Sequence, residues 1–374
     1  MRGLAPKLAV GVGSLALALL GVEVLLRVKG YAPLEQALEG RIELVRPSDF
    51  PGRGYELVPG AQGQGWGTVV AVNAHGFRGP ELDPATAGRT RIVALGDSIT
   101  FGNDLPYEHT WPAVLEREQR ARGAAVDVLN LGLGGYDTSQ EVATLVDLGL
   151  AFRPAHVVVA YCVNDLGIVS MSMETAFVPA DRANPLFRSR LAQGWHARAM
   201  ERRQRRALYE RNREEAYARA FAEEIAPLPE ALAAPLAALR ARVASAPTQE
   251  TDLATRRIPP RWYASEARLG RLSQAFAQLA TLARQHGFEV RVLLVPYLED
   301  DALILEGVAL VRALAEHHGL RVVDPRPAFL AAGLAQLRIR PEDPVHPDAA
   351  GHALLAAAVA EDLARAPVAG APPE

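Results

Sequence analysis

The feature that most constrains the fold is an alternation of short apolar runs with helix-forming stretches. Five runs of mainly branched apolar residues each have the length of one strand: Ile92–Leu95, Val126–Leu129, His156–Tyr161, Glu289–Val295 and Leu320–Val323. Such continuous apolar runs are typical of strands covered on both faces. Strands of this kind separated by helices favour a parallel sheet between two helical layers.

The segments between the runs predict the helices: Thr110–Arg122, Thr138–Leu148, Glu266–His286, Ala302–His318 and a last one ending near Arg365. Thr138-Ser139-Gln140-Glu141 has the spacing of a capping box, with Thr138 as the N-cap. The predicted architecture is a three-layer α/β/α sandwich with a five-stranded parallel, flavodoxin-like sheet. This domain spans residues 90–366, followed by a disordered tail over 367–374. Residues 167–264 break the alternation and predict an inserted helical subdomain, which either caps a site or forms a solvated excursion.

Four short polar motifs stand at the ends of predicted strands or in the last loop. They are Gly96-Asp97-Ser98-Ile99-Thr100, Asn130-Leu131-Gly132-Leu133-Gly134-Gly135, Val163-Asn164-Asp165 and Asp343-Pro344-Val345-His346. Ligands of parallel sheets bind at the carboxyl ends of the strands. We therefore expect the four motifs to contribute to one site.

The residue types in these motifs are those that acyl transfer through a serine ester requires. Ser98 is the candidate nucleophile. Asp343 precedes His346 by three residues, which lets its carboxylate orient the ring so that the other nitrogen serves as base. Gly135 and Asn164 are candidate oxyanion donors, because glycine admits close approach to a backbone N–H and asparagine adds a side-chain amide. Taken singly, each motif is weak evidence: a serine in such a turn is more often a cap, and Asp-x-x-His is also compatible with a capped loop or half a metal site. The glycine and asparagine are also compatible with turns.

The ordered set resembles the SGNH (GDSL-type) serine hydrolases over about residues 92–363, with the helical insertion unmatched. The resemblance implies that Ser98 is the nucleophile, His346 the general base and Asp343 its orienting acid. It also implies an oxyanion hole formed by the Ser98 and Gly135 backbone N–H groups and the Asn164 side chain. One position departs from the pattern: Cys162 stands where the third motif usually has glycine, and its side chain could narrow the pocket or shift Asn164.

Three functions are compatible with this set. The first is hydrolysis of a small O-acyl ester, such as O-acetyl on an envelope or extracellular glycan. The second is O-acyl transfer to a cell-envelope polysaccharide. The third is a non-catalytic glycan-binding protein of the same fold, which a long distance from Ser98 to His346 would favour. No second His, Asp or Glu cluster has metal spacing, and no Gly-x-Gly-x-x-Gly follows the first strand, so we expect no metal, cofactor or nucleotide.

The N-terminus predicts a membrane anchor. Leu8–Leu26 is apolar except for Glu23, and its 19 residues approach the length needed to span hydrocarbon. Glu23 and Arg27 are four residues apart and can pair on a helix. The alternatives are a cleaved signal peptide and a buried core helix. With Asn73-x-x-Gly76-Phe77-Arg78, this segment resembles a membrane-anchored bacterial branch of the family, with the catalytic domain outside the cytoplasm. Residues 1–29 then form a signal anchor, and residues 30–89 a Gly- and Pro-rich stalk and lead-in segment.

Charge and cysteine content limit the partners. The net charge of −3 gives no reason to expect nucleic acid. Cys162 is the only cysteine, which excludes an internal disulfide. Ten arginines lie between Arg182 and Arg213. Such a run indicates a solvated, salt-bridged helix face, or alternatively a surface that meets anionic lipid or an anionic polymer.

Overall fold

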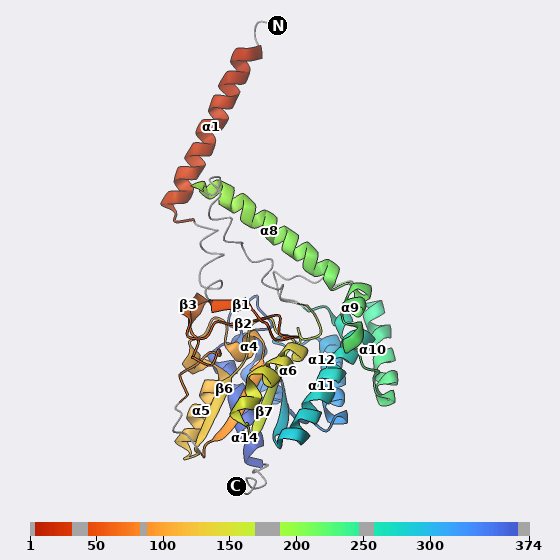
Figure 1. The fold of residues 1–374 in the computed structure, drawn as a ribbon. Helices are drawn as coiled ribbons and strands as arrows, with labels where there is room; N and C mark the ends of the chain where they lie inside the picture. Colours follow the sequence, from red (N-terminus) through yellow and green to blue (C-terminus); the bar gives the residue numbers. More distant parts are fainter. Residues whose placement is uncertain (1–3, 32–43, 83–87, 169–187, 247–257, 366–374) are drawn as a thin grey trace.

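The computed structural model describes residues 4–31, 44–82, 88–168, 188–246 and 258–365. The predicted tail at 367–374 and part of the predicted insertion lie outside these ranges. Figure 1 shows an α/β body from which two long helices, α1 (Leu4–Val28) and α8 (Arg190–Arg211), extend.

A five-stranded parallel sheet forms the centre of the body. Its strands are β5 (Thr90–Gly96), β6 (Val126–Asn130), β7 (His156–Tyr161), β8 (Glu289–Leu294) and β9 (Arg321–Val323). The order across the sheet is β6-β5-β7-β8-β9, and every neighbouring pair is parallel. All six residues of β7 are buried, as expected for a central strand covered on both faces. The predicted fold class is confirmed.

Helices cover both faces of this sheet. On one face α5 (Trp111–Ala121) packs against α14 (Ala349–Arg365), and on the other α6 (Thr138–Asp147), α11 (Glu266–His286) and α12 (Ala302–His317) pack side by side. Further helices of the body are α4 (Ser98–Phe101), α9 (Glu214–Ala220), α10 (Ala233–Ser245) and α13 (Arg326–Ala332). After β6 the chain crosses to the other side of β5, where β7 pairs with it. The strands β5 and β7 are therefore neighbours, and the loops that follow them lie next to each other at the carboxyl edge of the sheet.

Residues 44–82 are folded onto the body, which corrects the prediction of a stalk and irregular lead-in over residues 30–89. They form two antiparallel hairpins, β1 (Val45–Pro47) with β2 (Tyr55–Leu57) and β3 (Gln62–Gly65) with β4 (Thr68–Ala71). Apolar side chains of both hairpins share a buried cluster with residues of α4 and of the loop after β6: Phe101, Leu133 and Tyr136. We call residues 44–82 the hairpin segment.

Helix α1 projects from the body, and the apolar window Lys7–Val28 has none of its residues buried. Among the described residues it is the one helix long and apolar enough to cross a membrane; a signal sequence would have the same properties. The predicted pair is present, because Arg27 Nε donates to Glu23 Oε1 at 2.8 Å. Near its C-terminal end, α1 contacts the start of α8.

Candidate active site

Ser98 stands at the turn between β5 and α4, which the local sequence makes tight. Asp97 caps α4, since its Oδ1 accepts from the backbone N–H of Ile99 at 2.9 Å. Gly96 has φ of 154°, and a Cβ at this position would lie 2.1 Å from Thr100 Oγ1. Only glycine therefore allows the strand to turn this closely into the helix, which presents the Ser98 side chain at the carboxyl edge of the sheet.

The last loop brings His346 to Ser98, although the two residues are 248 positions apart. Ser98 Oγ and His346 Nε2 are 2.7 Å apart, which is the hydrogen bond expected from the sequence. On the other side of the ring, Nδ1 lies 3.1 Å and 3.2 Å from the two carboxylate oxygens of Asp343. A carboxylate beside Nδ1 favours the tautomer with the proton on that nitrogen, which leaves the Nε2 lone pair facing the serine hydroxyl.

Asp343 also organises its own loop. Its Oδ1 accepts from the backbone N–H groups of Val345 at 3.0 Å and His346 at 3.1 Å. The loop is tied to the Ser98 turn, because Arg340 reaches Asp104 at 2.5 Å. Asp343 and His346 are both buried, and His346 is 8% exposed. The carboxylate is thus held at the ring by several bonds rather than by the side-chain contact alone.

The second motif, Asn130–Gly135, packs against α4. Asn130 Nδ2 donates to Thr100 O at 2.7 Å, and its Oδ1 accepts from Gly132 N at 3.1 Å. Gly132 allows close packing, since a Cβ there would lie 2.6 Å from the backbone nitrogen of Phe101. Gly135 itself has φ of 85°, in the region that favours glycine. Its loop therefore runs beside the helix that Ser98 begins.

Asn164 in the third motif reaches the same turn. Its Nδ2 donates to Asp97 Oδ2 at 2.9 Å, and the Ser98 hydroxyl lies 3.2 Å from the same oxygen. Cys162, two residues earlier, has its side chain in the apolar core, where burial raises the pKa of the thiol. The cysteine does not prevent Asn164 from reaching the Ser98 turn.

The cap of α6 corrects the predicted capping box by one residue. The N-cap is Asp137, whose Oδ1 accepts from Gln140 N at 3.0 Å, while Gln140 Oε1 accepts from Asp137 N at 3.2 Å. Arg271 on α11 supplies the reason, because its guanidinium binds the other oxygen of Asp137 at 2.6 Å. Thr138 instead donates to Asp165 Oδ2 at 2.8 Å, behind Asn164.

With Asp137 as the N-cap and not Thr138, Glu141 is no longer a capping residue and its side chain lies inside the protein. Its side chain is buried, and neither carboxyl oxygen has a hydrogen-bond partner among the described residues. Burial raises the pKa of Glu141 well above its ordinary value, and the nearby charges of Asp165, Asp97 and Asp137 add to the rise. The pKa of Asp165 is raised for the same reasons, burial first and then Asp97. Sequence reasoning missed Glu141, because its position three residues after Thr138 is that of a capping residue.

Arg78 joins the hairpin segment to the C-terminal end of α4 and the loop after it. It is 1% exposed and donates to the carbonyls of Phe101 at 2.6 Å, Gly102 at 2.8 Å and Leu105 at 2.7 Å. Desolvation lowers its pKa to about 10. The sequence analysis used Asn73-x-x-Gly76-Phe77-Arg78 only for the family resemblance, and no local signal identified the three carbonyls that Arg78 binds.

His352 lies on α14, where it is buried. Its Nδ1 accepts from the backbone N–H of Trp111 at 3.1 Å, which requires the neutral ring. Burial lowers the pKa of His352 to about 3, with further contributions from His346 and Arg78. Among the described residues, no group of three or more His, Cys, Asp or Glu side chains is arranged to hold a metal ion.

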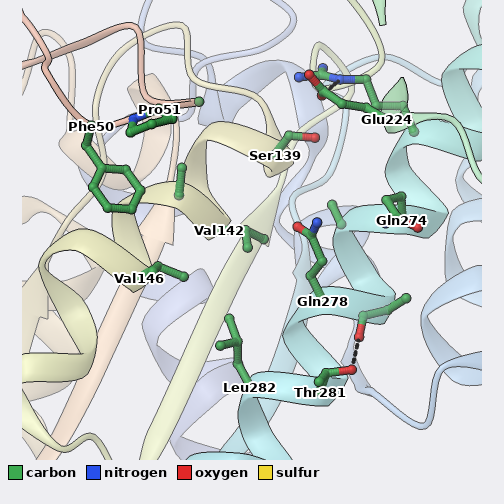
Figure 2. Close-up of a pocket in the computed structure, with 15 residues that line it drawn as sticks. Phe50, Pro51, Ser139, Val142, Val146, Glu224, Gln274, Gln278, Thr281 and Leu282 are labelled. Carbon is green, nitrogen blue, oxygen red and sulfur yellow. Dashed lines mark hydrogen bonds and ion pairs between the residues drawn. The ribbon is translucent and has the colours of Figure 1, made fainter. Parts of the chain in front are cut away.

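Two surface grooves lie apart from Ser98 and His346. One, of about 570 Å³, runs between α6 and α11, and Figure 2 shows Val142, Val146 and Leu282 on its walls with Phe50 at one side. The other, of about 750 Å³, lies where α9 meets the start of α11. Neither lining includes Ser98, which is itself 7% exposed.

Comparisons with known proteins identify the family of the chain. Residues 94–307, more than half of the chain, match the model of the GDSL-like lipase/acylhydrolase family; the match includes Ser98, Gly135 and Asn164 and ends before Asp343. An arylesterase from Vibrio mimicus is 30% identical over 84 residues, which cover 22% of this chain and 42% of the arylesterase. The matched part thus spans less than half the length of that curated relative.

Solved structures with a similar chain course include an α/β hydrolase enzyme from the metagenome of Lake Arreo, Spain. It is 18% identical with a TM-score of 0.39, over 74% of this chain and 94% of that chain. Axe2, an acetylxylan esterase from Geobacillus stearothermophilus, is 15% identical with a TM-score of 0.39, over 73% of this chain and 94% of that chain.

Proposed function

This chain belongs to the GDSL-like lipase/acylhydrolase family, and on that basis we propose that it hydrolyses a small O-acyl ester with Ser98 as the nucleophile. The observation that carries the proposal is the 2.7 Å contact between Ser98 Oγ and His346 Nε2, with Asp343 on the far side of the ring. A non-catalytic role is disfavoured by the same contact.

The geometry supports the following sequence of steps. Ser98 Oγ attacks the acyl carbonyl carbon while His346 Nε2 takes the hydroxyl proton, and Asp343 stabilises the imidazolium. The carbonyl oxygen becomes an oxyanion. His346 then gives the proton to the departing alkoxide, leaving an acyl group on Ser98. Water, deprotonated by His346, attacks that ester, and the carboxylate product leaves as Ser98 regains its proton.

Three donors are proposed for the oxyanion: the backbone N–H groups of Ser98 and Gly135 and the side-chain amide of Asn164. The amide nitrogen of Asn164 carries two hydrogens. One donates to Asp97, and the other has no partner among the described residues. Preorganised donors of this kind stabilise the developing charge at little reorganisation cost.

We propose a small acyl group, acetyl in particular, carried by an envelope or extracellular glycan. The low exposure of Ser98, 7%, favours a short acyl chain. The fully exposed apolar helix α1 supports a membrane anchor that places the body on the outer side of the inner membrane. Transfer of the acyl group to a sugar hydroxyl would use the same acyl-enzyme, with the sugar in place of water.

The test is a series of aryl esters of increasing acyl length, followed by an O-acetylated glycan, with kcat/KM measured for each. We expect kcat/KM to fall as the chain lengthens beyond acetyl, and Ser98→Ala to remove turnover throughout. Ser245→Ala, which changes an exposed serine at the end of α10, is the matched control and should keep full activity. Full activity in Ser98→Ala would refute the serine mechanism. Acyl transfer to an added glycan faster than release to water would identify a transferase.

A further inference from the structure

Helix α8 begins next to the C-terminal end of α1. The carboxylate of Glu23 on α1 accepts from the backbone N–H groups of Arg190 at 2.9 Å and Leu191 at 3.0 Å, and from Ser189 Oγ at 2.9 Å. Glu23 thus acts as the N-terminal cap of α8, supplied by another helix. Arg27 adds a second link, since it donates to Arg188 O at 2.5 Å.

A further contact holds the two helices together. The Tyr31 side chain packs against the second turn of α8, because a Cβ on Gly194 would lie 3.2 Å from both Cε1 and the hydroxyl oxygen of Tyr31. Figure 1 shows that α8 does not continue the line of α1 but crosses its direction, between the base of α1 and the body. If α1 spans the bilayer, Glu23 lies within about two turns of the helix end, at the level of the headgroups, and α8 runs along the surface.

One face of α8 combines exposed arginines with exposed aromatic side chains. Trp195, Arg198, Arg202, Arg206 and Tyr209 follow one another at spacings of three or four residues, so they form a stripe along one side of the helix. Trp195 is 70% exposed and Tyr209 50% exposed. We call these five residues the α8 stripe.

The sequence favoured a salt-bridged face for this run, and the side chains that the structure describes do not form one with the three arginines of the stripe. Among the side chains that the structure describes, none forms an ion pair with Arg198, Arg202 or Arg206. Their charge is therefore uncompensated within the described part of the molecule. Tryptophan and tyrosine are the side chains that concentrate at the membrane–water interface, and arginine clusters next to a spanning helix attract anionic lipid.

We propose that the α8 stripe lies on the membrane that α1 spans and binds the headgroups of anionic phospholipids. The inference rests on the proposed membrane anchor. In this arrangement α8 is a second attachment that sets the height and orientation of the catalytic body above the bilayer.

The experiment uses the full-length chain reconstituted in vesicles of phosphatidylcholine, with or without added phosphatidylglycerol. Trp195→Cys is labelled with an environment-sensitive fluorophore, and the buried Cys162 leaves this thiol as the accessible one. The control position is Arg211→Cys, an exposed site about 160° round the helix from Trp195. We expect a blue shift of the label at 195 when phosphatidylglycerol is present and none at 211. Raising the salt to about 1 M shortens the Debye length to about 3 Å and should reverse the shift.

The charge dependence is tested by combining Arg198→Gln, Arg202→Gln and Arg206→Gln in the labelled protein. The shift should be lost. The matched control combines Arg117→Gln, Arg122→Gln and Arg284→Gln, which change the net charge equally at exposed sites on the body, and should keep the shift. Aryl-ester turnover should be unchanged in both.

The outcomes separate this inference from the proposals on which it rests. If the protein floats with both kinds of vesicle but the label at 195 responds to neither, the anchor stands and the role of the stripe is overturned. A response to a soluble polyanion but not to phosphatidylglycerol vesicles overturns it in favour of an anionic polymer. Failure to float with any vesicle removes the anchor and the inference together. Absence of ester turnover in a protein whose label still responds to phosphatidylglycerol would refute only the proposed hydrolase activity.

Discussion

The side-chain amide of Asn164 donates a 2.9 Å hydrogen bond to the carboxylate of Asp97, the residue directly before Ser98. Asp97 accepts at the same time from Ile99 N, so its carboxylate joins the cap of α4 to the loop after β7. The position of one proposed oxyanion donor therefore depends on the same carboxylate that shapes the nucleophile's turn.

Replacing Asn164 should affect turnover more than substrate binding. In Asn164→Ala we expect kcat to fall by about 10²–10³, as loss of one oxyanion donor typically does, with KM little changed. Steady-state kinetics on an aryl acetate measures both parameters. Asn212→Ala, on the helical insertion, is the comparison. An unchanged kcat in Asn164→Ala would exclude the side chain from the oxyanion hole.

Ser98 and His346 should behave as one unit. Ser98→Ala, His346→Ala and the double variant should lose activity to similar extents, because His346 has no serine proton to accept once Ser98 is gone. The measurement is kcat/KM for the three variants on one ester, with the exposed His286→Ala as control. Losses that multiply in the double variant would show that the two side chains act independently.

His352 should make the fold sensitive to acid. Its pKa is about 3 in the folded protein, below the value of about 6.5 in an unfolded chain, so between these values only the unfolded state binds the proton. Stability is therefore present above about pH 6.5 and falls toward pH 3, by up to about 1.4 kcal/mol per pH unit.

Urea unfolding across this range tests the assignment to His352. His352→Asn keeps an acceptor for Trp111 N but cannot titrate, so the free energy of unfolding should fall less steeply with decreasing pH. The comparison is of slopes, since the smaller side chain also leaves space in the core. An unchanged slope would assign the acid sensitivity to other groups.

Glu141 should make the stability of the fold depend on pH in the opposite sense to His352. Its pKa is raised in the folded protein, so stability is fully present below the unfolded value of about 4.3 and is lost as the pH rises through the folded value. Glu141→Gln is nearly isosteric and carries no charge, and it should reduce this loss. Urea unfolding from acid to alkaline pH measures the effect, with Glu361→Gln on the exposed side of α14 as control. A steeper loss in Glu141→Gln than in the native protein would contradict the assignment.

The hairpin segment should determine where the N-terminus can be shortened. A protein that begins at Pro47 loses Leu44 and Val45, which are 0% and 5% exposed, and with them most of β1. Burial of one such side chain contributes about 1.5–3 kcal/mol, so this version should have a lower Tm. A version that begins at residue 32 should be soluble and keep the Tm and ester turnover of the body. Equal Tm values for the two versions would show that β1 is dispensable.

The sheet could be predicted from the sequence alone because each strand is specified by the residues of one short apolar run. The continuous apolar run of β7 is typical of a strand that is buried on both faces of a parallel sheet. Its predicted and observed bounds, His156–Tyr161, coincide. The Ser98, Asn164 and His346 motifs stand at strand ends or in the last loop, where a parallel sheet collects its site residues. Residue type, place in the alternation and the resemblance of the ordered set were sufficient to propose them as one site.

The tertiary structure decided what depends on partners far apart in the chain. Asp137 and Thr138 are both good N-cap residues, each followed three positions later by Gln or Glu, and the choice fell to Asp137 because Arg271 on α11 pairs with it. That choice placed Glu141 inside the protein. The hydrogen bonds from Arg78 to three carbonyls and from the start of α8 to Glu23 also join residues that are far apart in the chain. Periodicity and short motifs specify elements and candidate residues, whereas buried charges are positioned by whichever distant group satisfies them.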